Sequence, residues 1–239
     1  MARQTTRFRA SNDVAEGTRS FHFGKPAGFE FRAGQAIDLI LPPAAAGAEE
    51  QVHAFSIISA PDEDEIAIAT RMRDSSYKRA LAALSVGAEV ELDGPFGSLI
   101  LHKKATRAAV LVAGGIGITP FMSMLRHASR HPSGQALLLV YSNRRPEDTA
   151  FLAELQHLQE VLPDFRMLAT MTDIPQSTQA WSGRTGKVDG TFIRKAIEGL
   201  PDPVFYTSGP PGLVQAMRQV LVDAGIDEDD IRSEEFFGY

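Results

Sequence analysis

The sequence predicts two domains of different fold class, an antiparallel β domain followed by an α/β domain with a parallel sheet. Three observations support this prediction. The first hundred residues show short strand-like segments that are broken by glycine, proline and acidic clusters. From Thr106 onward, strand-like segments alternate with amphipathic helices, as in parallel sheets covered on both faces. The apolar run Ala108–Ala113 leads directly into the glycine-rich turn Gly114–Pro120.

The antiparallel domain is predicted to be a barrel or a sandwich. One helix interrupts its strands, with Tyr77, Leu81 and Leu84 on one face and Ser75 or Ser76 as its N-cap. The strands that the pattern predicts here are Ser20–Phe23, Ala36–Leu41, Ala54–Ile58 and Glu65–Thr70.

The second domain is predicted to contain a five-stranded parallel sheet. Its boundary with the first lies near Lys103–Arg107, which gives domains over 1–105 and 106–239. The predicted strands are 108–113, 136–141, 165–171, 204–207 and 231–235, and helices are predicted after Pro120, over 146–158 and over 211–224.

Composition excludes several classes of protein. The chain has 239 residues, no cysteine and a net charge of −6, with the acidic excess mainly in its C-terminal half. A chain without cysteine holds neither a disulfide framework nor a cysteine-ligated iron–sulfur cluster. The acidic balance argues against nucleic-acid binding, and no apolar run predicts a membrane span or a secretion signal. We therefore expect a cytoplasmic monomer with no nucleic-acid or membrane partner.

The turn from Gly114 to Pro120 is the strongest chemical signal in the chain. A strand, a glycine turn and a helix in this order bind pyrophosphate, because glycine lets the backbone approach and the first helical N–H groups face the negative charge. Pro120 is tolerated in the first helical turn, and it stands where the usual GxGxxG motif has its third glycine. The turn is thus a variant of the dinucleotide motif. No metal-binding or serine-nucleophile motif accompanies it, so no metal site is predicted.

Four motifs together resemble those of the ferredoxin–NADP reductase superfamily, and they occur in the same order. The resemblance implies a flavin-binding β-barrel domain followed by a nucleotide-binding parallel-sheet domain. The motifs are His53–Pro61, similar to the flavin motif Arg-x-Tyr-Ser in its His-x-Phe-Ser form; Gly114–Pro120, similar to GGxGxTP; Tyr206–Gly212, similar to the Cys-Gly-Pro segment with Ser208 in place of cysteine; and the acidic–aromatic ending Glu234–Tyr239.

In the flavin motif, the resemblance implies that Phe55 packs on the isoalloxazine, that Ser56 hydrogen-bonds near the flavin N5 and that His53 faces the FAD pyrophosphate, with Ala54 between them. Histidine carries a full charge only below neutral pH, whereas arginine is always charged. We therefore expect weaker, pH-sensitive flavin retention.

Other residues of the first domain are candidates for the same phosphates. Ser75 and Ser76 begin the predicted helix and offer backbone N–H groups and hydroxyls, although simple N-capping explains them equally. Arg71 and Arg73 either neutralise phosphate or form a solvated edge.

In the second domain, the resemblance implies that Gly114, Gly115 and Gly117 hold the coenzyme pyrophosphate and that Thr119 lies beside the nicotinamide. Gly209 and Pro210 let the chain pass close to the dinucleotide, and Ser208 lacks the polarizable sulfur of the family's cysteine. The second strand ends in Ser142, Asn143, Arg144 and Arg145 without an acidic residue, which favours the 2′-phosphate of NADPH. NADH stays open, because the two arginines also fit a solvated loop.

The C-terminal segment is predicted to reach the active site. In relatives a terminal aromatic ring covers the flavin and a nearby carboxylate takes part in catalysis. This suggests Phe237 or Tyr239 as the cover and Glu235 as the carboxylate, although Glu234 with Phe236 has the same spacing.

The sequence thus predicts an FAD-dependent NAD(P)H oxidoreductase. Hydride passes from the nicotinamide to the flavin, with Ser56, Thr119, Ser208 and Glu235 as catalytic residues, and electrons then pass to an external acceptor such as ferredoxin or flavodoxin. Two alternatives remain. One is a reductase of free flavin or ferric chelates without a protein acceptor, and the other is a regulatory module that binds flavin or nucleotide without turnover.

Overall fold

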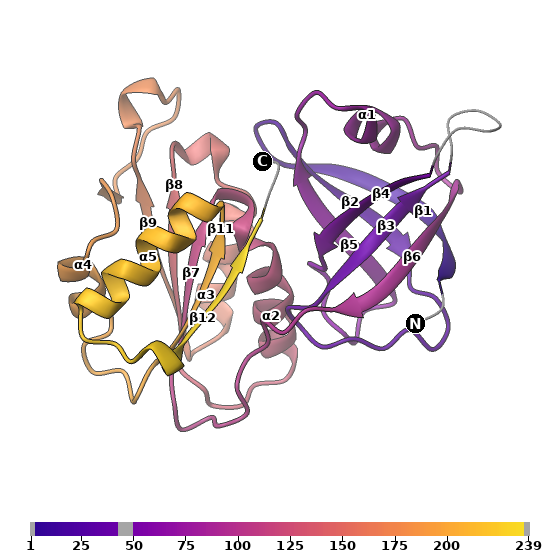
Figure 1. Cartoon of the computed structure of the whole chain (residues 1–239). Coiled ribbons are helices and arrows are strands. Elements are labelled where there is room, and N and C mark those ends of the chain that lie inside the picture. The colour runs from indigo at the N-terminus through magenta and orange to yellow at the C-terminus, as the bar shows by residue number, and fades with distance from the viewer. Residues whose placement is uncertain (1–2, 43–49, 237–239) are drawn as a thin grey trace. The chain divides into compact units, whose positions relative to one another are not determined.

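The chain forms two compact units (Figure 1). A computed structural model describes residues 3–42 and 50–236. The barrel unit comprises the chain up to Ile100 together with Thr119–His127, and the sheet unit comprises Leu101–Ile118 and the chain from Ala128 onward. Each unit has its own hydrophobic core.

The barrel unit is built on six antiparallel strands in the order β4-β3-β6-β1-β2-β5. Its first and last strands meet just after β4, where Ile57 bridges Ile68 and the Ile58 N–H donates to the Ala67 carbonyl at 2.8 Å. The sheet therefore closes on itself, and a barrel is confirmed. The strands are β1 (Gln4–Ala15), β2 (Thr18–Gly24), β3 (Ala36–Leu41), β4 (Gln51–Ser56), β5 (Glu65–Arg71) and β6 (Glu89–Phe96).

The core of the barrel follows from period-two alternation, which points every second side chain inward. Phe21 and Phe23 of β2 are inside, as are Ile37 and Leu39 of β3. Helix α1 (Ser76–Ala82) covers one part of this core with Tyr77 and Leu81. Ser75 caps it as predicted, because its Oγ accepts a hydrogen bond from the Lys78 N–H at 3.2 Å.

The sheet unit contains six parallel strands rather than the predicted five, in the order β10-β9-β8-β7-β11-β12. The additional edge strand, β10, has two exposed residues, so no hydrophobic pattern predicts it. The strands are β7 (Ala109–Gly114), β8 (Leu137–Asn143), β9 (Phe165–Met171), β10 (Arg184–Thr185), β11 (Val204–Gly209) and β12 (Ile231–Glu235).

Helices lie on both faces of this sheet (Figure 1). Helix α4 (Gly190–Ala196) and helix α5 (Pro211–Asp223) share one core with residues of β7, β8 and β11. Helix α3 (Leu152–Val161) lies on the opposite face. The prediction of one helix over 146–158 was wrong. Phe151 has a φ of 61°, a left-handed conformation that separates α3 from the 3₁₀ turn Pro146–Asp148.

Helix α2 (Thr119–Arg130) follows the 3₁₀ turn Gly115–Ile118, and its residues up to His127 group with the barrel unit. Two hydrogen bonds fix it there. Ser123 Oγ donates to the Ser59 carbonyl at 2.6 Å, and Arg126 Nη1 donates to the Ile58 carbonyl at 3.0 Å. Within residues 3–42 and 50–236, none of the helices has the length and apolar composition that crossing a membrane requires.

Candidate nucleotide and flavin sites

The strand order of the sheet unit creates a switch point at its centre. From β7 the chain moves outward on one side through β8 and β9, and it then returns to place β11 on the other side of β7. In open parallel sheets, ligands bind outside the carboxyl ends of the strands at such a point. Gly114 ends β7 and Gly209 ends β11, so two of the predicted motifs meet there.

The glycines of the turn are required by close packing between these two motifs. A Cβ at Gly117 would lie 2.2 Å from the Ser208 carbonyl oxygen and 2.6 Å from the Gly209 Cα. A Cβ at Gly114 would lie 2.3 Å from Leu213 Cδ1, and Gly115 has a φ of 54°. Protein atoms therefore occupy the space beside Gly114 and Gly117. If the turn binds pyrophosphate, it does so through its backbone N–H groups. This binding stays a prediction.

Tyr141 contacts the glycine turn through its hydroxyl. This buried side chain on β8 places its hydroxyl 3.0 Å from the Gly115 carbonyl oxygen and 3.3 Å from that of Ala150. No sequence pattern distinguishes Tyr141, since a tyrosine in an apolar strand is typical of a hydrophobic core. Its hydroxyl fixes the carbonyl of the one glycine in the turn with positive φ.

Several buried polar groups at this end of the sheet have no hydrogen-bond partner within the described part of the chain. They are Ser208 Oγ, both side-chain polar atoms of Asn143, and Glu234 Oε2. Buried polar groups are almost always paired in folded proteins, so such a set indicates a place where a polar ligand completes the bonding. Asn143 ends β8 and Ser208 lies near the end of β11, close to the switch point.

Glu234 rather than Glu235 lies beside Ser208. The register of β11 and β12 pairs Ser208 with Glu234 and Gly209 with Glu235, and paired residues of parallel strands point to the same face. Burial raises the pKa of Glu234 to about 7. The sequence could not separate the two glutamates, because both have the acidic–x–aromatic spacing. Phe236 follows with its N–H donating to the Gly209 carbonyl at 2.9 Å.

The two arginines after β8 have different surroundings. Arg145 makes a two-point contact with one carboxylate: its Nη2 and Nε donate to Asp148 at 2.7 and 2.9 Å, and its side chain is 24% exposed. Arg144 has a side chain that is 70% exposed and lies 2.7 Å from Asp173 Oδ2. Of the two guanidinium groups, that of Arg144 is therefore the more accessible to a ligand. Ser142, before them, is half-buried.

A buried carboxylate holds the segment that follows β9. Glu147 Oε1 accepts from the Thr178 N–H at 2.9 Å, and its Oε2 accepts from Ser177 Oγ at 2.8 Å. Within the same segment, the indole N–H of Trp181 donates to the Arg184 carbonyl at 2.8 Å. Neither residue was selected from the sequence.

In the barrel unit, three rings gather between β4 and α1. The rings of His53 and Phe55 stack with centroids 5.0 Å apart, and that of Tyr77 lies 5.2 Å from His53 and 5.9 Å from Phe55. His53 is half-buried and Ala54 is exposed, whereas Phe55 is only 3% exposed. Phe55 thus belongs to the core, and its stacking on an isoalloxazine stays a prediction.

Lys78 is a buried cation next to these rings, and the sequence did not single it out. Its Nζ donates to Thr70 Oγ1 and lies 5.3 Å from the centroid of the Phe55 ring. Burial, with a contribution from Arg73, lowers the pKa of Lys78 to about 8. Ser56 Oγ at the end of β4 is buried without a hydrogen-bond partner among the described residues. The site therefore combines a buried positive group with an unsatisfied hydroxyl.

The remaining predicted residues are distributed as follows. Arg71 ends β5 and is half-buried, Arg73 and Ser76 are exposed, Thr119 begins α2 and is buried, and Pro210 is exposed. Ser75 is exposed and already caps α1. Phe237 and Tyr239 lie outside the described residues.

Comparison with known proteins points to one group of enzymes. Residues 111–219 match the oxidoreductase NAD-binding domain family. The reductase component of propane 2-monooxygenase from Rhodococcus jostii (strain RHA1) is 30% identical over 217 residues, which are 89% of this chain and 57% of that protein. The glycine betaine monooxygenase reductase subunit of Chromohalobacter salexigens is 28% identical and is matched over 92% of this chain and 60% of its own length. The chain thus spans about three fifths of these curated relatives.

Solved structures share the whole two-domain fold. A ferredoxin NADP⁺ reductase from Neisseria gonorrhoeae, crystallised with FAD and NADP, has a TM-score of 0.81 at 23% identity, over 98% of this chain and 99% of that one. The flavohem-like FAD/NAD binding domain of nitric oxide dioxygenase from Vibrio cholerae has a TM-score of 0.84 at 20% identity, over 98% of both chains. The matched NAD-binding domain, the fold of both units and the sequence relatives all indicate a reductase fold. Residues 111–219 thus match the NAD-binding domain of oxidoreductases, and the chain as a whole has the two-domain fold of the Neisseria ferredoxin NADP⁺ reductase.

Proposed function

We propose that the chain is an FAD-dependent NAD(P)H reductase that delivers electrons to a separate acceptor. The observation that carries this proposal is the set of unpaired buried polar groups at the switch point of the parallel sheet, from Asn143, Ser208 and Glu234. They accompany a glycine turn whose backbone packs against β11. A nicotinamide dinucleotide offers amide, ribose and phosphate groups that match such partners.

The barrel residues fit FAD by two independent features. Ser56 Oγ is a buried group that lacks a partner within residues 3–42 and 50–236, and Lys78 is a buried cation whose pKa is lowered to about 8 by burial and by the charge of Arg73. A phosphate placed near Lys78 and His53 would stabilise the charged form of the lysine, which burial disfavours. When bound, FAD accepts a hydride and releases single electrons. Ser56 would orient the reacting ring edge, and Lys78 with His53 would hold the phosphates.

In the sheet unit, groups of the turn, of β11 and of β12 would orient the coenzyme, and one carboxyl group would hold a proton beside it. The first N–H groups of the turn at Gly115–Ile118 would bind the pyrophosphate. Ser208 and Glu234, paired in register, would contact the nicotinamide end, where a carboxyl with a pKa of about 7 holds its proton near neutrality. Arg144 would bind the 2′-phosphate of NADPH, and we favour this coenzyme over NADH for that reason.

The electron acceptor is proposed to be a separate protein. The relatives in Rhodococcus and Chromohalobacter are reductase components of oxygenase systems, and this chain has no cysteine with which to hold an iron–sulfur cluster. A ferredoxin or a flavodoxin supplies a one-electron acceptor of the required kind.

Anaerobic reduction tests the function directly. The purified protein should be yellow, release FAD rather than FMN on acid treatment, and lose its flavin absorbance when NADPH is added without oxygen. Subsequent mixing with oxidised ferredoxin or flavodoxin should restore the absorbance. A protein that binds FAD but is not bleached by either coenzyme would be a binding module. Reoxidation by ferric chelates but not by ferredoxin or flavodoxin would contradict the proposal of a protein acceptor.

Coenzyme choice yields a prediction that separates the two arginines. Arg144→Ala should raise the KM for NADPH by roughly 10- to 100-fold, because a charge-assisted hydrogen bond to phosphate is lost. The KM for NADH should change little, since NADH has no 2′-phosphate. Steady-state kinetics with both coenzymes measures the difference, and equal changes in the two KM values would remove Arg144 from the phosphate site.

Two control variants sharpen this test. Asp173→Asn removes the carboxylate 2.7 Å from Arg144 and should lower the KM for NADPH, because the phosphate no longer competes with it. Arg145→Ala removes a guanidinium engaged by Asp148 and should act mainly on stability. A larger coenzyme effect from Arg145 than from Arg144 would reverse the assignment.

A further inference from the structure

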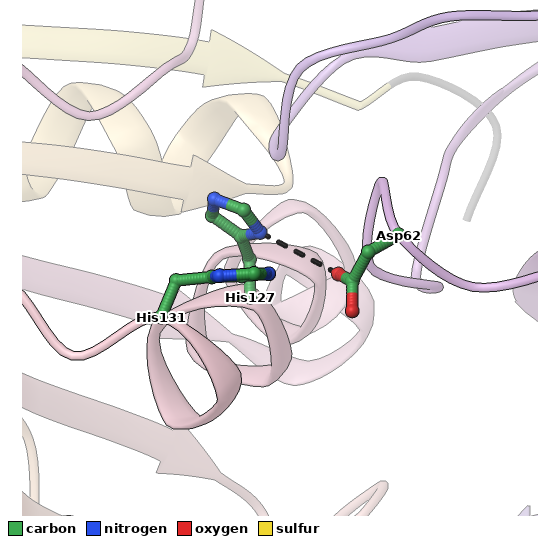
Figure 2. Close-up of side chains that lie close together, drawn as sticks. All are labelled: Asp62, His127 and His131. Carbon is green, nitrogen blue, oxygen red and sulfur yellow. Dashed lines mark ion pairs between the residues drawn. The ribbon is translucent and has the colours of Figure 1, made fainter.

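One cluster of metal-ligating side chains contains none of the residues proposed above to bind flavin or coenzyme. Asp62, His127 and His131 each place one ligand atom so that all three atoms lie within 4.8 Å of one another. Among the residues that the structure describes, this is the one group of three or more histidines and carboxylates with such spacing. Figure 2 shows both imidazole rings at the end of α2, beside the loop that carries Asp62.

Local structure brings the three side chains together. His127 lies on α2, and His131 directly follows the last residue of that helix, four positions further on. A spacing of four puts two side chains on the same helical face, the arrangement by which paired histidines bind zinc. Asp62 belongs to the loop between β4 and β5, which α2 already contacts through Ser123 and Arg126.

The distances are close to those of a bound metal. His127 Nδ1 and Asp62 Oδ1 are 3.6 Å apart, as the dashed line in Figure 2 marks. Two ligands of a tetrahedral zinc ion, each about 2.0–2.1 Å from the metal, lie about 3.3 Å from each other. Asp62 and His131 are exposed, so small side-chain rotations suffice to reach this geometry.

We propose that Asp62, His127 and His131 form a binding site for a divalent transition-metal ion of the zinc class. Two imidazole nitrogens and one carboxylate oxygen are the donor set that such ions prefer, and Mg²⁺ is a poor match because it selects oxygen ligands. A water molecule completes the tetrahedron. The bound ion joins the loop at Asp62 to α2 and adds to the two hydrogen bonds already there. This inference is independent of the proposed function.

Isothermal titration of the full chain, freed of any polyhistidine tag, tests the site. Zn²⁺ should bind at one site per chain, and Mg²⁺ should give no heat of binding. Asp62→Asn, His127→Gln and His131→Gln should each weaken Zn²⁺ binding by roughly tenfold or more. His157→Gln is the matched control, because His157 Nδ1 lies at the same 3.6 Å from the carboxylate of Glu160 in an exposed pair. It should leave Zn²⁺ affinity unchanged.

Thermal unfolding gives a second readout that does not depend on electron transfer. Saturating Zn²⁺ should raise the Tm of the unaltered chain by about 5 °C and should leave the Tm of His131→Gln unchanged. His131 is exposed at a helix end, so its variant is expected to fold. Absence of saturable binding at millimolar Zn²⁺, or equal affinities in the unaltered chain and the His131→Gln variant, would overturn the proposal.

Discussion

Replacing Gly117 with alanine is expected to lower the free energy of unfolding by about 3 kcal/mol or more and to abolish coenzyme binding. The added Cβ would lie 2.2 Å from the Ser208 carbonyl oxygen and 2.5 Å from its carbonyl carbon. Both are backbone atoms of β11, so no side-chain rotation relieves the overlap. Either the turn or the end of β11 must move. Urea unfolding followed by circular dichroism measures the first effect, and coenzyme titration measures the second.

Gly212→Ala is the matched control for this substitution. Gly212 lies in the first turn of α5, and apart from its chain neighbours and the backbone of its own helix no described atom comes within 4 Å of the place where its Cβ would stand. Alanine in a helix is more favourable than glycine, so this variant should be neutral or slightly more stable. Equal stability of the Gly117 and Gly212 variants would show that the turn is not packed as described.

The second large effect is expected at Glu234. Its pKa is raised by burial from 4.5 to about 7, so the native state retains a proton that the unfolded chain releases. The contribution of Glu234 to stability is therefore fully present below pH 4.5 and is lost as the pH rises through about 7. Above that pH the cost approaches about 3 kcal/mol. Glu234→Gln, which stays neutral, should be more stable than the unaltered chain by up to this amount at pH 8 and nearly equal to it at pH 4.

This comparison requires urea titrations of both proteins at the two pH values. Glu235→Gln controls for the general loss of one negative charge, because its partly exposed side chain is the next along β12. If the difference between Glu234→Gln and the unaltered chain is the same at both pH values, the carboxyl of Glu234 does not titrate in this range.

Much of the fold could be predicted because local patterns and burial agree. The strands 36–41 and 165–171 have the predicted bounds, since apolar residues fill one or both of their faces, and the strand 231–235 also has its predicted bounds. Strand β1 was missed because it is twelve residues long and mostly exposed, so polar residues fill it. Strand β6 was missed because Gly94 and Pro95, which usually mark a turn, lie inside it.

The candidate site was predictable as a set of motifs but less so as individual side chains. The turn at 114–120 and the segment at 206–212 meet as expected, because parallel strands bring their carboxyl ends to one edge. Which arginine is accessible depends on the carboxylates of Asp148, three residues beyond Arg145, and of Asp173, which follows the next strand. Which glutamate lies beside Ser208 depends on the register of β11 and β12, and that register has no local sequence signal.

The segment held by Glu147 determines how unfolding of this protein can be observed. Trp181 is the chain's one tryptophan, and it lies three residues beyond Thr178, which Glu147 binds. Indole emission therefore reports the local order of this segment and not the melting of either hydrophobic core. A fluorescence transition that precedes the loss of ellipticity would mark release of this segment, a separate step that a single optical probe would mistake for global unfolding.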